Sequence, residues 1–380
     1  MATTLALFAL LSWIYLSLLH GQFWQPLFDV VSTELEQWPS VVIVIPARNE
    51  AAALPQTLPS LLAQDYPGSW HIILVDDHST DNTGTVAQKL AVEKNQIDRL
   101  TVISAPDVAE GWNGKVAAMN VAAAQSTEDF ILFTDADIRH PPDSMRRLVA
   151  RAVSHRLDLN SLMVKLNCSS FAEKLLIPAF VFFFAMLFPF RHANNMDSSV
   201  AAAAGGVMLV RKKALNNVGG LSTIKNALID DCALAKVIKR AGGDYGAAGR
   251  TRLTLTEDVV SIRPYPTIAS IRQMIARTAF TQLNHSPILL LGTVLGLAFL
   301  FLWPLIMIFA GEFSAAACGY IIWLLMTLLY RPTVFLYGLP LMWAFTLPIA
   351  AVIYIIATID SAWQYWQGKG GQWKGRIQAR

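Results

Sequence analysis

The sequence is poor in cysteine. Its 380 residues include three, Cys168, Cys232 and Cys318, which lie far apart and form no C-x-x-C pair. This spacing offers neither the framework of a disulfide-stabilised domain nor the paired ligands of a zinc site. The cysteine content is therefore compatible with a reducing, cytoplasm-facing location of the protein.

Charge is also scarce. Charged residues make up 15% of the sequence and hydrophobic residues 54%, and the mean hydropathy is +0.42. A soluble enzyme of ordinary surface is less apolar, so we expect part of the chain to lie in lipid. The net charge of +3 is too small to indicate a nucleic-acid partner. Basic residues beside apolar segments fit an anionic lipid surface better.

The longest runs without charge lie near the two ends of the chain. Residues 2–19 are long enough to cross a bilayer and lack the basic flank and cleavage site of a secretory signal. We therefore interpret residues 1–20 as an N-terminal transmembrane anchor. Residues 288–358 predict C-terminal transmembrane helices at about 288–310, 314–330 and 334–357, with a tight turn at Arg331-Pro332 between the last two.

Residues 38–265 have mixed charge and predict a separate domain. Short β-branched or aliphatic runs alternate with helical stretches, and polar residues follow each run. This alternation predicts a doubly wound α/β sheet, which binds nucleotides outside the carboxyl ends of its strands. We expect strands at 41–45, 70–75, 100–103 and 130–134, and helices at 49–62, 83–95, 115–124 and 229–240.

Two further segments are expected to meet the membrane surface. Residues 171–190 are apolar but too short for a comfortable span, so they are either interfacial or buried as a plain core helix. A crossing there would separate the acidic pairs at 135/137 and 230/231 by a bilayer. Residues 267–286 are amphipathic and predict a helix in the interface that leads into the membrane.

The sidedness of the membrane segments is in conflict. The domain is basic, and so is the tail 359–380, which carries Lys369, Lys374, Arg376 and Arg380. Basic segments favour the cytoplasmic side, yet three full C-terminal spans would put the domain and the tail on opposite sides of the membrane. Either one segment is re-entrant or divided differently, or the tail lies outside.

The stretch 130–140 holds the most informative residues. An apolar strand ends there in Asp135 and Asp137. If the extended backbone continues to Asp137, the two side chains share one face. Two converging carboxylates suit Mg²⁺ or Mn²⁺, ions that carry diphosphates. The alternative is a solvated strand end that caps the next helix.

Three ordered motifs carry a family resemblance: Pro46-Ala47-Arg48-Asn49-Glu50, Val75-Asp76-Asp77-His78-Ser79-Thr80-Asp81 and Asp135-Ala136-Asp137. They resemble a family 2 glycosyltransferase with the GT-A fold, over about residues 40–280. The later series Gly205-Gly206, Arg211, Gly219-Gly220 and Asp230-Asp231 is similar to the acceptor half of that family. The membrane helices and the stretches 111–115, 277–282 and 373–376 resemble the branch associated with hopanoid biosynthesis.

The resemblance implies an α/β fold class: a GT-A (Rossmann-like, nucleotide-diphospho-sugar transferase) domain plus transmembrane α-helices. It also implies a nucleotide-sugar site. Asp77, with Asp76 beside it, would accept hydrogen bonds from the base or ribose of a UDP-sugar. Asp135 would hold the ribose or metal-bound water, and Asp137 would ligate Mg²⁺ or Mn²⁺.

Other donor-site assignments have plain structural alternatives. Pro46 would end the strand beneath the nucleotide, and Asn49 and Glu50 would line the donor cleft, although both could only cap a helix. Lys115 would face the phosphates, or be a solvated lysine at a helix start. Asp76 and Asp77 could instead cap the helix at 83–95, but Ser79 and Asp81 are equally good caps.

An inverting transfer needs a base for the acceptor hydroxyl. The resemblance assigns this role to Asp231, with Asp230 second. Acidic residues also favour helix N-termini for purely structural reasons. Processive family members carry Q-x-x-R-W, whereas Gln273 and Arg277 here are one residue too far apart and Thr278 replaces Trp. This departure favours a single transfer. Arg272 and Arg277 could bind phosphate or simply lie at a membrane edge.

We therefore expect an inverting, metal-dependent glycosyltransferase in the inner (cytoplasmic) membrane. It would move one sugar to a lipid acceptor, a hopanoid or another polyisoprenoid. The domain would face the cytoplasm, where nucleotide-sugar donors are found. Two alternatives are a polyprenyl-phosphate glycosyltransferase, which would need Arg272 or Arg277 for its anionic acceptor, and a non-catalytic nucleotide-sugar-binding membrane protein.

Overall fold

The computed structural model describes residues 2–28, 34–246, 248–309, 311–373 and 376–377. Lys374 and Arg380 of the basic tail lie outside these residues. The chain divides into two compact units. Unit 1 contains residues 1–26, 167–191 and 264–371, and unit 2 contains residues 27–166, 192–263 and 372–380.

Unit 2 is built on an eight-stranded mixed sheet with the order β3-β2-β1-β4-β7-β6-β8-β5. Strands β1 to β4 are parallel, and β7 runs antiparallel to β4. The strands are β1 (Val41–Ala47), β2 (Trp70–Asp76), β3 (Leu100–Ser104), β4 (Phe130–Thr134), β5 (Ile138–Arg139), β6 (Leu159–Lys165), β7 (Val207–Arg211) and β8 (Thr251–Ser261). The predicted strands and α/β class are confirmed.

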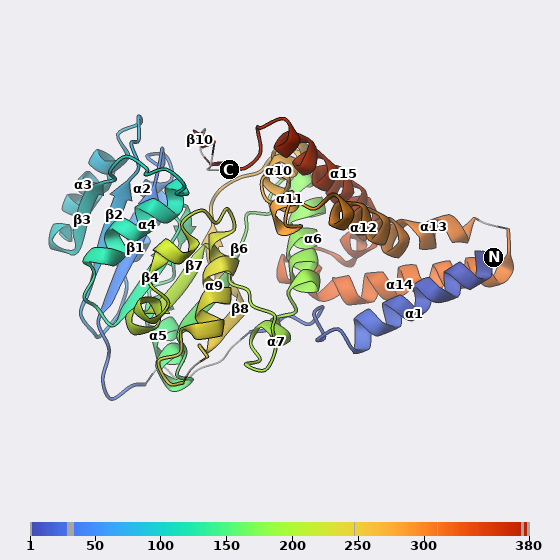
Figure 1. The fold of residues 1–380 in the computed structure, drawn as a ribbon, viewed down its shortest axis with the longest axis horizontal. Coiled ribbons are helices and arrows are strands. Elements are labelled where there is room, and N and C mark those ends of the chain that lie inside the picture. Colours follow the sequence, from blue (N-terminus) through green and yellow to red (C-terminus); the bar gives the residue numbers. More distant parts are fainter. Residues whose placement is uncertain (1, 29–33, 247, 310, 374–375, 378–380) are drawn as a thin grey trace. The chain divides into compact units, whose positions relative to one another are not determined.

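Helices cover both faces of this sheet (Figure 1). The side chains of β1 alternate between the two faces of the sheet. One face carries Val41, Ile43 and Ile45, which pack toward α2, α3 and α5. The other carries Val42 and Val44, which pack toward α4 and α9. All seven residues of β1 are buried, as expected for a central strand with two covered faces. The helices are α2 (Leu54–Leu62), α3 (Thr83–Glu93), α4 (Gly114–Gln125), α5 (Ser144–Ser154), α8 (Lys212–Asn217) and α9 (Asp230–Ala241), with 3-10 turns η1 (Ile97–Arg99) and η2 (Leu221–Ile224).

The helix expected from residue 49 begins later, at Leu54. Asn49 has a left-handed φ of 52°, and its amide donates to Ser79 Oγ. The amide of Glu50 donates to Thr83 Oγ1. These two amides donate to Ser79, in the loop after β2, and to Thr83, at the start of α3. They therefore make no helical hydrogen bonds, and α2 starts only after them.

Unit 1 is helical. Its elements are α1 (Ala2–Leu18), α6 (Phe171–Leu187), α10 (Ile268–Ala276), α11 (Ala279–Gln282), α12 (Pro287–Leu297), the π-helical turn η3 (Ala298–Leu302), α13 (Trp303–Ile308), α14 (Phe313–Leu336), the 3-10 helix η4 (Leu341–Thr346) and α15 (Leu347–Trp366). The short α7 (Phe190–Ala193) and the strands β9 (Gln372–Trp373) and β10 (Arg376–Ile377) complete the described elements. Among the residues that the structure describes, three stretches are long and apolar enough to span a membrane: Pro287–Ile308, Phe313–Leu336 and Leu341–Trp366.

The apolar segment at 171–190 forms α6, which clusters with the helices of unit 1. Ser170 and Glu173 form a capping box at its start. Tyr354 of α15 donates a hydrogen bond of 3.0 Å to the Leu176 carbonyl, and the ring of Phe182 packs on Tyr330 of α14 at 5.3 Å. The helix is therefore packed among other apolar helices and is not part of the core of unit 2.

Two expectations for unit 1 are wrong in detail. The predicted turn at Arg331-Pro332 is absent, because α14 continues through these residues to Leu336 and is followed by Gly338, which has a left-handed φ of 67°. The amphipathic stretch after Thr267 is split, because α10 ends at Ala276 and α11 begins at Ala279. The amide of Phe280 donates to Ser361 Oγ at 2.9 Å, a tertiary contact that sequence periodicity does not show.

The pairing of α13 with α14 depends on one close backbone approach. A Cβ at Gly319 would lie 2.3 Å from the carbonyl oxygen of Pro304 and 3.2 Å from the amide of Ile308. A Cβ at Gly296 in α12 would have no described atom within 4 Å. The two glycines therefore differ in packing although both lie in apolar helices.

We expect Gly319→Ala to lower the melting temperature of the purified protein in detergent, because overpacking of this kind costs about 1–3 kcal/mol. Gly296→Ala is the matched control and should leave stability unchanged or raise it, since alanine is the better helix former. Tryptophan fluorescence during heating measures both. Equal melting temperatures for the two variants would contradict the close packing of α13 on α14.

Candidate functional site

The loops that follow β1 and β2 are tied together by side chains. Arg48 Nη1 donates to the carbonyl of Asp77 at 2.7 Å and lies 3.3 Å from the Asp77 carboxylate. Thr80 N donates to Asn49 Oδ1 at 2.8 Å. Asn49 therefore positions the neighbouring loop and does not cap α2, whose N-cap makes no side-chain hydrogen bond.

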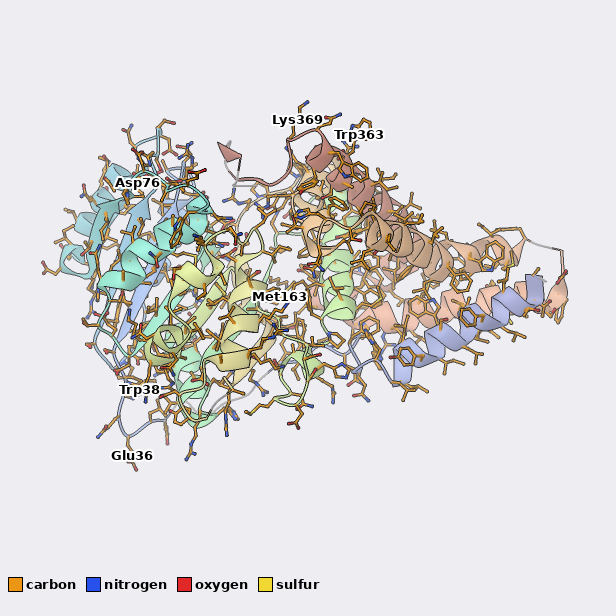
Figure 2. The ribbon with its side chains drawn as sticks, in the orientation of Figure 1. Glu36, Trp38, Asp76, Met163, Trp363 and Lys369 are labelled. Atoms are coloured by element: carbon orange, nitrogen blue, oxygen red, sulfur yellow. The ribbon has the colours of Figure 1, made fainter. Side chains whose placement is uncertain are left out.

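Asp77 is fully buried beside β2, whose carboxyl end is formed by Asp76 (Figure 2). The Asp77 carboxylate pairs with Arg48 and with His78 Nδ1 at 3.1 Å. Helix capping is carried out elsewhere, because Asp81 Oδ1 accepts from the amide of Thr83. Asp76 Oδ1 accepts from the amide of Ser79 at 3.0 Å. The capping alternative for Asp77 is thus wrong.

A second group of charges lies between the end of β4 and the starts of α4 and α9. Lys115 Nζ is 2.9 Å from Asp135 Oδ1 and 3.5 Å from Asp230 Oδ2. The Lys115 side chain is only 14% exposed, so the interpretation as a solvated lysine is wrong. Burial acts to lower the pKa of Lys115, but the charges of Asp135 and Asp230 outweigh it and raise this pKa. Lys115 is therefore a permanent cation.

Asp231 completes this group. Its Oδ2 accepts from the amide of Gly205 at 2.7 Å, and a Cβ at Gly205 would lie 3.2 Å from that oxygen and from Lys115 Nζ. Burial, with the Asp230 charge second, raises the pKa of Asp231 to about 6. Such a carboxyl group is ionised at neutral pH and is a stronger base than an ordinary aspartate.

Asp137 belongs to a third group, which includes an arginine that the sequence patterns did not reveal. Arg263 Nε is 2.7 Å from Asp137 Oδ2, and Arg263 Nη2 is 2.8 Å from Glu50 Oε1. Ser261 Oγ also donates to Asp137 Oδ2, at 3.2 Å. Pairing of Ile138 with Ser261 between β5 and β8 brings Arg263 to this position. The only sequence signal for Arg263 is a basic residue just after a strand.

Asp135 and Asp137 do not share a strand face. β4 ends at Thr134, and a turn at residues 136 and 137 separates it from β5. The expectation of a continuous extended backbone is therefore wrong. Burial raises the pKa of Asp135, and the charge of Asp137 contributes to this shift, so the turn keeps the two carboxylates within electrostatic reach of each other.

The carboxylates at this edge of the sheet can be compared with the ligands that a divalent cation needs. Within the part of the chain that the structure describes, no three His, Cys, Asp or Glu side chains form a metal-binding group. Mg²⁺ is commonly held by one or two carboxylates together with substrate phosphates, so a two-carboxylate site fits. Asp135 and Asp137 are oxygen donors of the right kind. In the structure Lys115 pairs with Asp135, and Arg263 pairs with Asp137.

Other predicted residues lie outside these groups. Arg272 and Arg277 belong to unit 1, where Arg272 Nε is 3.6 Å from Asp360 Oδ2. The prediction that Pro46 ends its strand is wrong, because β1 continues to Ala47 and Pro46 lies buried within it, beside Val75 of β2. His140 is buried between Thr134 and Ser144, and burial lowers its pKa to about 4, so it is a structural histidine.

Parts of this chain are similar to two enzymes with assigned activities. Over 198 residues, 28% are identical to a β-monoglucosyldiacylglycerol synthase of Synechocystis, covering 52% of this chain and 40% of that protein. Over 115 residues, 31% are identical to an undecaprenyl-phosphate 4-deoxy-4-formamido-L-arabinose transferase of Proteus mirabilis, covering 30% of this chain and 33% of that protein. The chain thus spans less than half the length of either relative.

The fold has a solved counterpart. A mannosyltransferase of Pyrobaculum calidifontis, solved with GDP-Man and Mn²⁺, has a TM-score of 0.59 and 19% identity, covering 94% of this chain and 99% of that one. These relatives are lipid-glycosylating or sugar-transferring enzymes, and they do not support the hopanoid-associated branch that the sequence resembles. Residues 42–219 match the model of glycosyl transferase family 2. These residues, a little under half of the chain, therefore form a glycosyl transferase family 2 region, and its motifs lie on a GT-A-like α/β domain.

Proposed function

We propose that the protein transfers one sugar from a nucleotide-sugar donor to a lipid hydroxyl, with inversion, and that Asp231 is the base. The observation that carries the proposal is the half-buried Asp231 carboxylate at the start of α9, whose pKa is raised to about 6 beside Lys115, the partner of Asp135. A group with this pKa is free to accept a proton near neutral pH.

The donor would bind where the loops after β1, β2 and β4 end. Asp77, held by Arg48, would accept hydrogen bonds from the base or ribose, with Asp76, Asn49 and Glu50 alongside. Nucleotides bind at this edge in open α/β sheets, which supports the placement. UDP is the nucleotide that we infer from the motif resemblance, and GDP is the alternative that the Pyrobaculum structure raises.

Mg²⁺ or Mn²⁺ would be held by Asp135 and Asp137 and, when bound, would neutralise negative charge on the diphosphate. Lys115 would remain beside Asp135 and face the same phosphates as a fixed positive charge. Arg263 would release Asp137 and stay near Glu50. This chain's own cations therefore keep the two carboxylates in place between catalytic cycles.

The acceptor would be an amphiphile that reaches the protein through the membrane. The named relatives support a diacylglycerol lipid or a polyprenyl phosphate, and the motif resemblance supports a hopanoid. Arg272 and Arg277 would face an anionic acceptor in the polyprenyl-phosphate case. We infer a location in the cytoplasmic membrane, with unit 2 in the cytoplasm, from the basic residues beside the apolar helices.

A panel assay identifies both substrates. Purified protein is incubated with radiolabelled UDP- and GDP-sugars and with diacylglycerol, undecaprenyl phosphate or a hopanoid, and the organic phase is counted. Label in the diacylglycerol or hopanoid sample supports transfer to a hydroxyl, whereas label only with undecaprenyl phosphate supports the alternative acceptor. Release of free sugar without lipid product in every sample would contradict lipid glycosylation.

Asp231→Asn should reduce turnover by about 10²–10⁴-fold, because base catalysis contributes that much. Donor binding, measured by calorimetry, should be retained, since the amide oxygen can still accept from Gly205. Asp230→Asn is the matched control at the neighbouring residue and should reduce turnover less. If Asp230→Asn abolishes turnover and Asp231→Asn does not, the assigned base is wrong.

The pH profile of kcat/KM should have an acidic limb centred near pH 6. Below this pH the raised pKa leaves Asp231 protonated and unable to accept the acceptor's proton, and above it the base is ionised. Initial rates at saturating metal between pH 4.5 and 8, a range chosen to bracket a pKa of about 6, measure the limb. A flat profile across this range would exclude a base with the expected pKa.

Removal of divalent cations with EDTA should abolish transfer, and Mn²⁺ or Mg²⁺ should restore it. Asp137→Asn should raise the metal concentration needed for half-maximal rate and weaken donor-dependent Mn²⁺ binding measured by calorimetry. Asp129→Asn, at the opposite end of β4, is the control and should leave both unchanged. Full activity without added metal after EDTA treatment would refute the role of Asp135 and Asp137.

A further inference from the structure

The last apolar stretch, Leu341–Trp366, is long enough to span a membrane. We propose that it does not span, and that residues 337–366 form a re-entrant hairpin in a single lipid leaflet. In this arrangement η4 enters the bilayer to about half its depth, and α15 returns to the side from which the chain came. The partner of the hairpin's outer surface is the acyl-chain region of that leaflet.

The two sides of the bilayer can be assigned from contacts within unit 1. The far side is marked by the turn between α13 and α14, where Thr3 Oγ1 donates to Glu312 Oε2 at 2.8 Å and lies 2.9 Å from Ser314 Oγ. The near side is marked by the start of α12 at Pro287 and by the α11 residues before it. Figure 1 shows α1, α13 and α14 reaching the far end of unit 1 together.

The carboxyl end of α15 lies on the near side. The ring of Tyr365 stacks on His285 at 4.1 Å, and Trp366 packs on Phe280 at 5.6 Å. Both partners immediately precede α12. Trp363 and Lys369, labelled in Figure 2, belong to this end of α15 and the chain after it.

The amino end of α15 and the preceding η4 lie at mid-depth. Phe345 of η4 packs on Trp323 at 5.7 Å, and Trp323 lies near the middle of α14 (Phe313–Leu336). α15 packs against α10, α11, α12 and η3, whereas α13, which continues to the far side, packs on α14 and α1. Residues 337–347 therefore run back along α14 only as far as its centre.

The length of the uncharged part of α15 supports the same conclusion. Residues 347–359 precede Asp360, and a helix of this length covers about 20 Å at 1.5 Å per residue. The hydrocarbon core is about 30 Å thick, and runs this short are typical of re-entrant or buried segments. Asp360 pairs with Arg272 of the amphipathic α10, as expected at a lipid–water interface.

Non-helical backbone inside a bilayer must be satisfied by protein groups. Trp323 Nε1 donates to the Phe345 carbonyl at 3.4 Å, and Thr346 Oγ1 donates to the Trp343 carbonyl at 2.8 Å. The amide of Trp343 donates to the Pro340 carbonyl. The backbone of the turn into α15 therefore has hydrogen-bond partners within the protein at a depth in the bilayer where water cannot supply them.

This topology removes the conflict between charge and span number. The crossings that remain are α1, the α12–α13 stretch and α14, so the chain after Trp366 returns to the side on which α12 begins. Arg272, Arg277 and Lys369 then share one side, and the far turn carries the acidic Glu312. The excess of basic residues identifies the near side as cytoplasmic. Side chains exposed on the hairpin, including Leu341, Met342, Ile349, Val352 and Ile356, would contact the lipid of that leaflet.

Cysteine labelling tests the topology in the full-length protein. Gln273→Cys, Pro340→Cys, Lys369→Cys and Glu312→Cys each alter an exposed position and are made one at a time. Right-side-out and inside-out vesicles are treated with a membrane-impermeant thiol reagent, and mass spectrometry locates the label, so the native cysteines can stay. Gln273→Cys and Pro340→Cys define the near side and Glu312→Cys defines the far side.

We expect Lys369→Cys to be labelled together with Gln273→Cys and Pro340→Cys, and protected in the vesicles in which Glu312→Cys is labelled. Labelling of Lys369→Cys together with Glu312→Cys would overturn the hairpin and establish Leu341–Trp366 as a fourth crossing. A bimane fluorophore on Met342→Cys gives a second measurement with lipids brominated at defined depths. Quenching should be strongest within the near leaflet, and strongest quenching in the far leaflet would also overturn the proposal.

Discussion

Charge pairing at one edge of the sheet is the interaction on which this structure depends. Acidic side chains that follow β1, β2 and β4, or that begin α9, would repel one another if they were left alone. Lys115 lies between Asp135 and Asp230, Arg263 lies between Asp137 and Glu50, and Arg48 pairs with Asp77. Each pair joins residues of different elements, so the pairs also hold the loops in place.

The same arrangement separates two kinds of carboxylate. Asp135 and Asp137 each have a cation within 3 Å, which keeps them available as oxygen donors. The amides of Gly205 and Cys232 donate to the Asp231 carboxylate, and burial raises the pKa of this group in spite of them. Neighbouring carboxylates with different partners can take different roles, one as a base and others as ligands. This division supports the proposed transfer more strongly than any single motif.

The sequence was most informative where one physical rule dominates. Unbroken apolar runs located β1 to β4, because a strand covered on both faces must be apolar on both faces. Acidic pairs after these runs located most of the site, since parallel strands bring their carboxyl ends to one edge. Periodicity was less reliable at the ends of elements: α2 begins late because Asn49 and Glu50 bond the next loop, and α14 continues past Arg331-Pro332.

By itself, then, the sequence determined the α/β domain, its order of motifs and the presence of long apolar helices, all of which follow from local hydrophobic patterning. Tertiary structure alone decided that Arg263 meets Asp137 through the pairing of β5 with β8, and that Lys115 is buried between two carboxylates. It also decided that α15 ends beside Phe280 and His285. These contacts join residues far apart in the chain, and hydropathy measures how apolar a segment is but not which neighbours it packs against.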